Sequence, residues 1–311
     1  MILSASRRTD IPAFYPQWLM NRLRAGEVLV PAVRNPRQYR RIVLSPEVID
    51  CIVFWTKNPM PLMPALPVIQ DMGYPFYIQF TLTGYGKDIE PGLPDKAELA
   101  GALIELGKTF GPQAVVWRYD PILIDEYHTA VWHIQKFQDL CGRLAGYTDR
   151  CVISFIDLYA KLKGRFRALT QPEITMLAAA FSDATAACGL PLYTCAEEVD
   201  LSSFGIRHGA CIDPDLAQWA AGVPLRLRKE PGRAVCHCAQ SVDIGVYNTC
   251  GHGCAYCYAN QDGRRAAAYA RQLDPAAPSI AGWPGEADVI VEKPMATCRR
   301  AQKSIFDPDE G

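Results

Sequence analysis

Short, continuously apolar runs followed by helical patterns are the feature that most restricts how this chain can fold. Six such runs occur at residues 1–5, 51–55, 76–81, 114–117, 151–156 and 190–194. An unbroken apolar run is what a parallel strand needs when both faces of its sheet are covered. Apolar residues three and four positions apart, the spacing of an amphipathic helix, occur in segments 96–110, 126–144 and 172–187. The sequence therefore predicts an α/β fold of repeated β/α units.

Glycine and proline positions mark the expected ends of these helices. Gly111, Gly146 and Gly189 follow the periodic segments, where a left-handed C-terminal cap is needed, and Thr170 with Pro172 indicates a helix start. Two strand-like runs around Arg34-Asn35-Pro36 predict an inserted hairpin over residues 27–45. The pattern loosens between about residues 200 and 233, and one more apolar run follows at 242–247.

Composition and charge exclude several classes of protein. No apolar run approaches the ~20 residues that span a bilayer, so we expect no membrane segment. The opening residues lack the apolar core of a secretory signal, which favours a cytoplasmic protein. The net charge of −1 gives no overall attraction to nucleic acid. Twelve cysteines in a chain of 311 residues without an export signal favour metal binding over disulfides.

Polar side chains follow each of the six predicted strands. The carboxyl ends of parallel strands meet at one rim, where such folds place their chemistry. The basic side chains suit an anionic substrate, because Arg offers a bidentate fork to phosphate or carboxylate. The acidic ones can equally well neutralise those bases in salt bridges, and both interpretations stay open. The candidate substrate-binding or catalytic residues are Arg7, Arg8, Asp10, Lys57, Arg118, Asp120, Asp157, Glu197 and Glu198.

Three cysteines at spacings of four and three follow the last apolar run. Cys250, Cys254 and Cys257 can bind three irons of a [4Fe–4S] cluster and leave the fourth iron open. The amine and carboxylate of S-adenosylmethionine can chelate that iron, and an electron from the cluster can then cleave the cofactor to a 5′-deoxyadenosyl radical. Tyr256, directly before the third cysteine, is placed to lie against the adenine.

Two other chemistries remain open for these cysteines. Cys254-x-x-Cys257 is also a zinc spacing, which Cys250 or His252 could complete. An electron-transfer cluster is the other alternative, and it requires a fourth cysteine. A zinc-stabilised binding protein or an electron carrier would then replace the enzyme.

The motif with Tyr256 resembles the signature of the radical S-adenosylmethionine superfamily. The chain up to about residue 260 resembles the family called domain of unknown function 1848 through SASRRTDIP, FWTKNP, WRYDPI, CAEEVDL and SVDIGVYNTCGHGCAYCYAN. Several stretches are similar to spore photoproduct lyase and its relatives, in which lysine- and arginine-containing strand ends line the barrel. The resemblance implies a partial (β/α) TIM-like barrel and an external electron donor, either a reductase or a flavodoxin- or ferredoxin-type protein.

The position of the cysteines departs from that superfamily, in which the motif follows the first strand. Here it lies near residue 250, which predicts a circular permutation with residues 242–247 in the place of the first strand. One permuted domain is expected over residues 1–262, with the cluster loop at 247–260 and a helix and extended tail at 263–311. This arrangement requires Cys250 to lie at the same rim as Arg7, Lys57 and Arg118.

Four more cysteines are candidates for a second metal site. Cys195 follows the sixth predicted strand, Cys211 lies beyond it, and Cys236 and Cys238 precede the cluster segment. Together they could bind a second iron–sulfur cluster or zinc, and unpaired thiols are the alternative.

The remaining expectations concern the cofactor and the substrate. Polar residues available to the amino-acid and ribose parts of S-adenosylmethionine are Ser6, Thr56, Gln79, Asn248 and Thr249. The substrate from which hydrogen is abstracted is unknown. A nucleic-acid repair reaction of the photoproduct-lyase type is the alternative enzyme activity, and the absence of a basic tract disfavours it.

Overall fold

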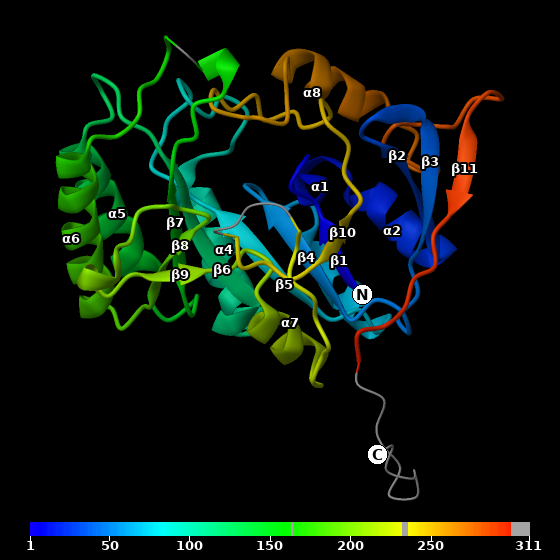
Figure 1. Cartoon of the computed structure of the whole chain (residues 1–311), viewed down its shortest axis with the longest axis horizontal. Coiled ribbons are helices and arrows are strands. Elements are labelled where there is room, and N and C mark those ends of the chain that lie inside the picture. Colours follow the sequence, from blue (N-terminus) through cyan, green and yellow to red (C-terminus); the bar gives the residue numbers. More distant parts are fainter. Residues whose placement is uncertain (163, 232–235, 300–311) are drawn as a thin grey trace, which may run out of the picture.

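One eight-stranded parallel sheet organises the protein. The computed structural model describes residues 1–162, 164–231 and 236–299. The strand order is β10-β1-β4-β5-β6-β7-β8-β9, and every neighbouring pair is parallel (Figure 1). The strands are β1 (Ile2–Ala5), β4 (Cys51–Thr56), β5 (Phe76–Thr81), β6 (Val115–Ile122), β7 (Cys151–Phe155), β8 (Leu192–Cys195), β9 (Arg207–Gly209) and β10 (Ser241–Asp243). The α/β fold with a large parallel sheet is confirmed, and within the described residues the sheet is open, with edges at β10 and β9.

In the described part of the chain, eight α-helices connect and cover the strands. They are α1 (Ile11–Phe14), α2 (Pro16–Ala25), α3 (Leu66–Asp71), α4 (Lys96–Phe110), α5 (Ala130–Leu144), α6 (Gln171–Ala187), α7 (Pro214–Ala221) and α8 (Gly263–Gln272). Single 3-10 turns form η1 (Met63–Ala65), η2 (Pro112–Ala114), η3 (Ala160–Leu162) and η4 (Ser202–Phe204). Among the described residues, no helix combines the length and apolarity that a bilayer crossing requires.

The two faces of the sheet bury different cores. Leu3, Phe54 and Trp117 point into the larger core, where α2, α4, α5 and α6 pack. Stacked rings join β6 to the helices there: the centroids of Trp117 and Phe137 are 5.0 Å apart, and those of Phe137 and Phe181 are 3.8 Å apart. The opposite face buries Val53 and its neighbours against the segment around α7. Both faces are therefore covered, which explains the unbroken apolar runs.

Helix ends follow the capping chemistry of the sequence. The Asp95 side chain accepts from the Ala97 amide at the start of α4, and Thr170 with Glu173 forms a capping box at the start of α6. Gly189 follows α6 with a φ of 65°. Gly111 has a φ of 87° but a ψ of 154°, so it ends α4 in an extended form rather than the left-handed helical cap that we expected.

A second sheet contains the predicted hairpin. β2 (Glu27–Ala32) and β3 (Asn35–Val43) are antiparallel, and β11 (Val289–Glu292) adds a parallel strand beside β3. The tail after α8 therefore runs back along the hairpin, and the Cys298 amide donates to Asp50 at 2.6 Å. This strand was not predicted, because 289–292 is a single short run in a proline-rich segment. The last part of the expected tail, 300–311, lies outside the described residues.

Strand β10 places the cysteine segment beside the first strand of the chain. Ser241, Val242 and Asp243 pair with Ile2, Leu3 and Ser4 in parallel. The strand is shorter than the predicted run at 242–247, because the Asp243 carboxylate turns to accept from the hydroxyls of Ser4 and Ser6 and from the Arg7 amide. The next residues leave the sheet at the same rim as those that follow β1.

The loosened region around residues 200–233 contains elements that the sequence analysis missed. β9 adds three mostly exposed residues, Arg207–Gly209, to the edge of the sheet, and α7 packs on β4 and β5. No apolar pattern marks β9. The start of α7 has a sequence signal, Asp213 followed by Pro214. In the structure the Asp213 side chain accepts from the amides of Asp215 and Leu216 and caps the helix.

Candidate functional site

The cysteine loop closes on itself at the carboxyl rim of the sheet. The Asn248 amide donates to the Ala259 carbonyl at 2.9 Å, and the Asn260 side chain donates to the Cys250 carbonyl. Figure 1 shows α1 and α8 together at this end and α7 toward the other. The Tyr15 hydroxyl donates to the Thr249 carbonyl at 2.7 Å, which ties the loop to the segment between α1 and α2.

Glycines let the loop pack closely against its neighbours. A Cβ on Gly92 would lie 2.5 Å from the His252 carbonyl oxygen, and one on Gly251 would lie 2.8 Å from the Phe14 ring. Gly263, at the start of α8, approaches Gly253 in the same way. The glycines are therefore needed because a side chain at these positions would clash with neighbouring atoms.

All three cysteines of the loop are partly buried by this packing. Burial raises the pKa of the Cys254 thiol to about 12, although Lys57 opposes the rise. Burial also raises the pKa of the Cys250 thiol, and Asp10 adds to the rise. These thiols stay protonated near neutral pH unless a metal or a cation stabilises the thiolate.

The donor set of the loop is compatible with an iron–sulfur cluster. Three thiols lie on one closed loop, and the buried Nδ1 of His252 and Oδ1 of Asn260 have no hydrogen-bond partner. Within the described residues, no three Cys, His, Asp or Glu side chains are already gathered as a metal-binding group. His252 Nε2 lies 2.8 Å from the Asp10 carboxylate, which leaves the unpartnered Nδ1 as the ring nitrogen that could bind a metal.

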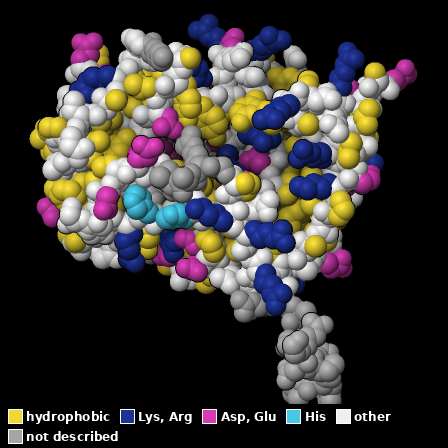
Figure 2. Space-filling view, viewed as in Figure 1, with side chains coloured by type: hydrophobic (Ala, Val, Ile, Leu, Met, Phe, Trp, Pro, Cys, Tyr) yellow, Lys and Arg dark blue, Asp and Glu magenta, His cyan; other side chains and the backbone are white. Residues whose placement is uncertain are grey.

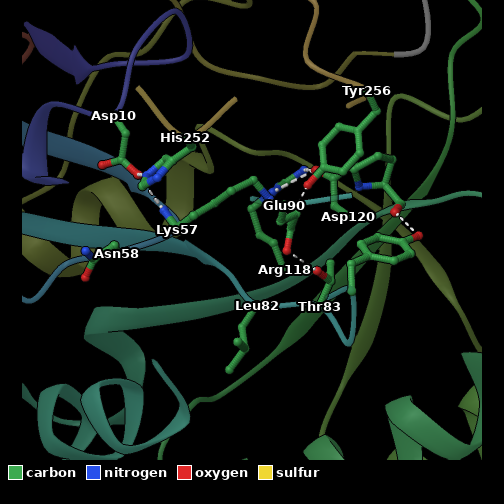
Figure 3. A network of polar contacts seen from close by, with 12 residues as sticks. Asp10, Lys57, Asn58, Leu82, Thr83, Glu90, Arg118, Asp120, His252 and Tyr256 are labelled. Carbon is green, nitrogen blue, oxygen red and sulfur yellow. Dashed lines mark hydrogen bonds and ion pairs between the residues drawn. The ribbon is translucent and has the colours of Figure 1, made fainter. Parts of the chain in front are cut away.

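A buried carboxylate lies between two lysines beside the cysteine loop. Lys57 Nζ is 3.0 Å from Glu90, and the Tyr256 hydroxyl also contacts this carboxylate (Figure 3). Lys96 contacts the same carboxylate. Thr83 donates to its second oxygen at 3.0 Å. Burial alone would raise the pKa of Glu90, but Lys57 and Lys96 outweigh it and hold the pKa at about 2. The carboxylate is charged at neutral pH.

Glu90 was missed by the sequence analysis. It lies in a polar loop after β5, beyond the residues that directly follow the strand. The segment returns to the rim because the Ala255 amide donates to the Ile89 carbonyl and the Gly92 amide donates to the His252 carbonyl, at 2.8 Å and 2.9 Å. The sequence feature that could have identified Glu90 as a site residue is an acidic side chain in a Gly- and Pro-rich loop after a strand.

Tyr256 is engaged by protein groups rather than left open. Its ring is buried, the Lys57 ammonium lies 5.2 Å from the ring centroid, and the Tyr85 ring centroid is 6.1 Å away. The predicted contact with adenine therefore stays a prediction. Lys57 retains its charge, because burial would lower its pKa but Glu90 raises it above the ordinary value.

Asp10 has a positioning role that the sequence did not indicate. Its carboxylate accepts from the Ala13 amide at 3.0 Å, which caps α1, and from the Lys57 amide at 2.8 Å. Its contact with His252 adds the cysteine loop to the same group. Asp10 therefore joins the ends of β1 and β4 to the loop.

Arg118 and Asp120 form the salt bridge that was one of the two predicted alternatives. Arg118 Nε is 3.1 Å from Asp120, and Ser154 also donates to this carboxylate. Burial would raise the pKa of Asp120, but Arg118 lowers it below the ordinary value. The guanidinium also lies 5.6 Å from the Trp55 ring centroid. Its charge is neutralised within the protein.

Arg7 and Arg8 line a pocket of about 540 Å³ between the rim and the hairpin. Arg34, Arg40 and Lys293 line the same pocket, and Figure 2 shows basic side chains gathered on this side of the molecule. Aromatic rings lie beneath both arginines: Arg7 is 5.9 Å from the Trp55 centroid, and Arg8 is 5.3 Å from that of Tyr247.

The other predicted residues are placed as follows. Glu197 accepts from the Phe155 amide at 2.8 Å, Asp157 accepts from the Tyr159 hydroxyl at 3.2 Å, and Glu198 is exposed. The polar side chains expected to bind the cofactor all have partners within the protein: Ser6 donates to Asp243, Thr56 accepts from the Asn58 amide, Gln79 donates to the Cys211 carbonyl, Asn248 accepts from the Gln261 amide and Thr249 donates to the Val246 carbonyl.

The second cysteine group is gathered, but two of its members are bonded. Cys195 and Cys211 form a disulfide with their Cα atoms 6.6 Å apart, so two of the four candidate ligands are not free thiols in this structure. The pairing follows from the fold, because the segment after β9 brings Cys211 back to the end of β8. Cys236 and Cys238 are free and pack in the same apolar cluster.

Comparisons with known proteins identify the family of this chain. A search of curated proteins finds no match. A crystal structure of a putative alpha-L-fucosidase from Bacteroides thetaiotaomicron aligns with a TM-score of 0.23 at 12% identity, covering 67% of this chain and 78% of that one. That likeness is too weak to carry an argument. The family described as Domain of unknown function (DUF1848) matches residues 2–259, and the chain therefore belongs to the DUF1848 family.

Proposed function

We propose that the protein is a radical S-adenosylmethionine enzyme in which Cys250, Cys254 and Cys257 hold a [4Fe–4S] cluster. The observation that carries this proposal is the position of the cysteine loop. It follows β10, the edge strand parallel to β1, and lies at the carboxyl rim beside Lys57 and Asp10. The loop is last in the chain but next to the first strand in space, which is what a circularly permuted barrel of this superfamily requires.

The residues around the loop suit this chemistry. When bound, the cluster would supply the electron that cleaves S-adenosylmethionine to a 5′-deoxyadenosyl radical. The Lys57 ammonium lowers the cost of negative charge at Cys254, and Cys250 and Cys254 are both partly buried in the loop. Asp10 holds His252 and the ends of two strands in one arrangement. An electron donor of the reductase, flavodoxin or ferredoxin type is part of the proposal.

An anionic substrate is supported by the charges that remain at the rim. Arg118 is paired with Asp120 and Lys57 with Glu90, whereas Arg7 and Arg8 face a pocket with three further basic side chains. Arg7 also lies 3.9 Å from Asp243, so its charge is partly compensated. Phosphate or carboxylate groups fit this side of the site best.

Nucleic-acid repair is a second candidate, and the same pocket favours it. Basic side chains interleaved with Trp55 and Tyr247 are typical of surfaces that bind single strands by charge and stacking. Binding of a single-stranded oligonucleotide should then weaken steeply with salt. An equal affinity of the wild type and an R7Q/R8Q variant for the oligonucleotide would remove this candidate.

Production of 5′-deoxyadenosine tests the leading proposal. The full chain is reconstituted anaerobically with iron and sulfide, reduced with dithionite and mixed with S-adenosylmethionine. We expect 5′-deoxyadenosine from the wild type and from the control Cys188→Ser, which changes a cysteine distant in sequence from the loop. We expect none from C250A/C254A/C257A. An intact cluster without this product would identify an electron carrier, and zinc without iron would identify a zinc protein.

A further inference from the structure

Four cysteines lie in the apolar cluster on the face of the sheet that α7 covers. Cys195 ends β8, Cys211 follows β9, and Cys236 and Cys238 precede β10. All four belong to one apolar cluster, in which Cys211 is 7% exposed and Cys238 is 2% exposed. The Cys236 thiol lies within hydrogen-bonding reach of Cys238, so the free pair is adjacent as well as the bonded one.

The backbone around these cysteines is fixed by hydrogen bonds from several elements. The Cys211 carbonyl accepts from Gln79 at 2.7 Å and from the Tyr77 hydroxyl at 3.2 Å, which anchors it to β5. The Ala239 amide donates to the Ile212 carbonyl at 2.8 Å, which anchors the segment after Cys238. The backbone at Cys211 and directly after Cys238 is therefore anchored beside the sheet.

Two donors are aimed at the sulfur atoms themselves. The Ile212 amide donates to Cys238 Sγ at 3.4 Å, and Arg118 Nη1 lies 3.2 Å from Cys211 Sγ. Amide and guanidinium donors stabilise the negative charge of thiolates, and such donors tune the sulfur ligands of metal centres. A buried arginine beside a neutral disulfide gains much less from this contact than one beside a thiolate.

We propose that Cys195, Cys211, Cys236 and Cys238 form a tetrathiolate metal site, which takes an iron–sulfur cluster or zinc. A dithiol reductant opens the Cys195–Cys211 bond: two electrons and two protons pass to the two sulfur atoms, and the reductant becomes a disulfide. Four thiols then lie in one cluster, and metal binding displaces their protons. The site is separate from Cys250, Cys254 and Cys257 and does not rest on the proposed radical chemistry.

Gln79 and Arg118 acquire a role in this proposal. Gln79 was expected to contact S-adenosylmethionine, but it donates to the Cys211 carbonyl and accepts from Arg118 at 3.4 Å. Arg118 in turn links Cys211 to Asp120 at the rim. One hydrogen-bonded chain therefore runs from the second cysteine group to the carboxyl ends of the central strands.

Metal and sulfide analysis of a variant without the first cysteine group tests the proposal. Full-length C250A/C254A/C257A is prepared anaerobically with dithiothreitol, and separate samples receive iron with sulfide or Zn²⁺ alone. We expect about one metal centre per chain after removal of excess reagent. Iron with sulfide would identify a cluster, and zinc without sulfide would identify a zinc site. Failure to retain either metal would overturn the proposal.

Further variants show whether these four cysteines are the ligands. Adding C236S/C238S should abolish the retained metal, whereas adding Cys188→Ser should leave it unchanged. Single Cys195→Ser and Cys238→Ser variants, checked by circular dichroism for folding, should each lose at least half of the metal. Unchanged metal content in the folded variants would overturn the ligand assignment. If C250A/C254A/C257A retains metal but the wild type forms no 5′-deoxyadenosine, the second metal site stands and only the proposed radical activity is rejected.

Discussion

The two cysteine groups differ in how the chain assembles them. Cys250, Cys254 and Cys257 lie within eight residues on one loop, so their spacing alone identifies a candidate site. The second group draws on the ends of β8 and β9 and on the segment before β10, and it exists only because the sheet brings these segments together. A local motif can be recognised before the fold is known, whereas an assembled site follows from the strand order.

Their surroundings differ as strongly as their assembly. The first group faces a buried carboxylate between two lysines, together with Asp10 and His252. The second group is packed in apolar side chains. A charged side chain that reaches it is Arg118, which donates to the Cys211 sulfur atom. Changes in charge should therefore disturb the first region most.

Glu90→Gln should have the largest effect on folding. The substitution leaves Lys57 and Lys96 without their buried counter-charge, and removing one partner of a buried pair costs about 3–5 kcal/mol. Because both ammonium groups retain some contact with water, we expect about 3 kcal/mol of the free energy of unfolding to be lost. Urea denaturation of the metal-free protein measures this loss.

The matched control is Glu173→Gln, which breaks the ion pair with Arg167 at the surface. Exposed pairs contribute about 0–1 kcal/mol, and glutamine keeps the capping box of α6. If both variants lost the same free energy of unfolding, the buried carboxylate of Glu90 would stabilise the protein no more than an exposed ion pair does.

Acid should remove the same contribution from the wild type. The pKa of Glu90 is about 2 in the folded protein against 4.5 ordinarily, so the unfolded chain binds more protons between these values. Stability from this group is complete above pH 4.5 and is lost as the pH falls toward 2, by up to about 3 kcal/mol. Glu90→Gln does not titrate, so the stability gap between the two proteins should narrow over this range. A constant gap would contradict the assignment.

The parts of the fold that were predicted correctly have local causes. β5 and α4 have the predicted bounds, because unbroken apolar residues and the Asp95 cap act within their own segments. The six predicted strands lie in one parallel sheet because each is an unbroken apolar run that is covered on both faces. β9 was missed because its exposed Arg-His-Gly sequence is held by its neighbour β8 rather than by a pattern of its own.

The site residues show the same division. Lys57, Asp10 and the cysteine loop were expected at one rim and lie there. Glu90 and the Cys195–Cys211 bond could not be read from spacing, because each depends on a loop that returns to the sheet through contacts distant in sequence. Gln79 and Thr249 were polar residues with no motif, and the protein itself occupies their hydrogen-bonding groups.

Gly92→Ala should show how tightly the first group is packed. The added methyl would lie 2.5 Å from the His252 carbonyl oxygen, and overpacking against backbone costs about 1–3 kcal/mol. Gly101→Ala is the control, because the exposed Gly101 in α4 has nothing within 4 Å of its added Cβ. It should stabilise the protein by about 0.5–1 kcal/mol through helix propensity. Urea denaturation compares the two, and a stabilised Gly92→Ala variant would show that the loop moves aside.

Arg8→Gln should have the smallest effect on folding and separates stability from binding. Its guanidinium lies over Tyr247 and donates to the Gly245 carbonyl at 3.4 Å, and such partly exposed contacts contribute about 0.5–1 kcal/mol. The same charge lines the pocket beside the hairpin, so the affinity for inorganic triphosphate should fall more than the stability does. Calorimetric titration at two salt concentrations measures both the affinity and its electrostatic part. If triphosphate binds Arg8→Gln as well as the wild type, the anionic ligand must be sought at Arg7 and the inner rim, next to the first cysteine group.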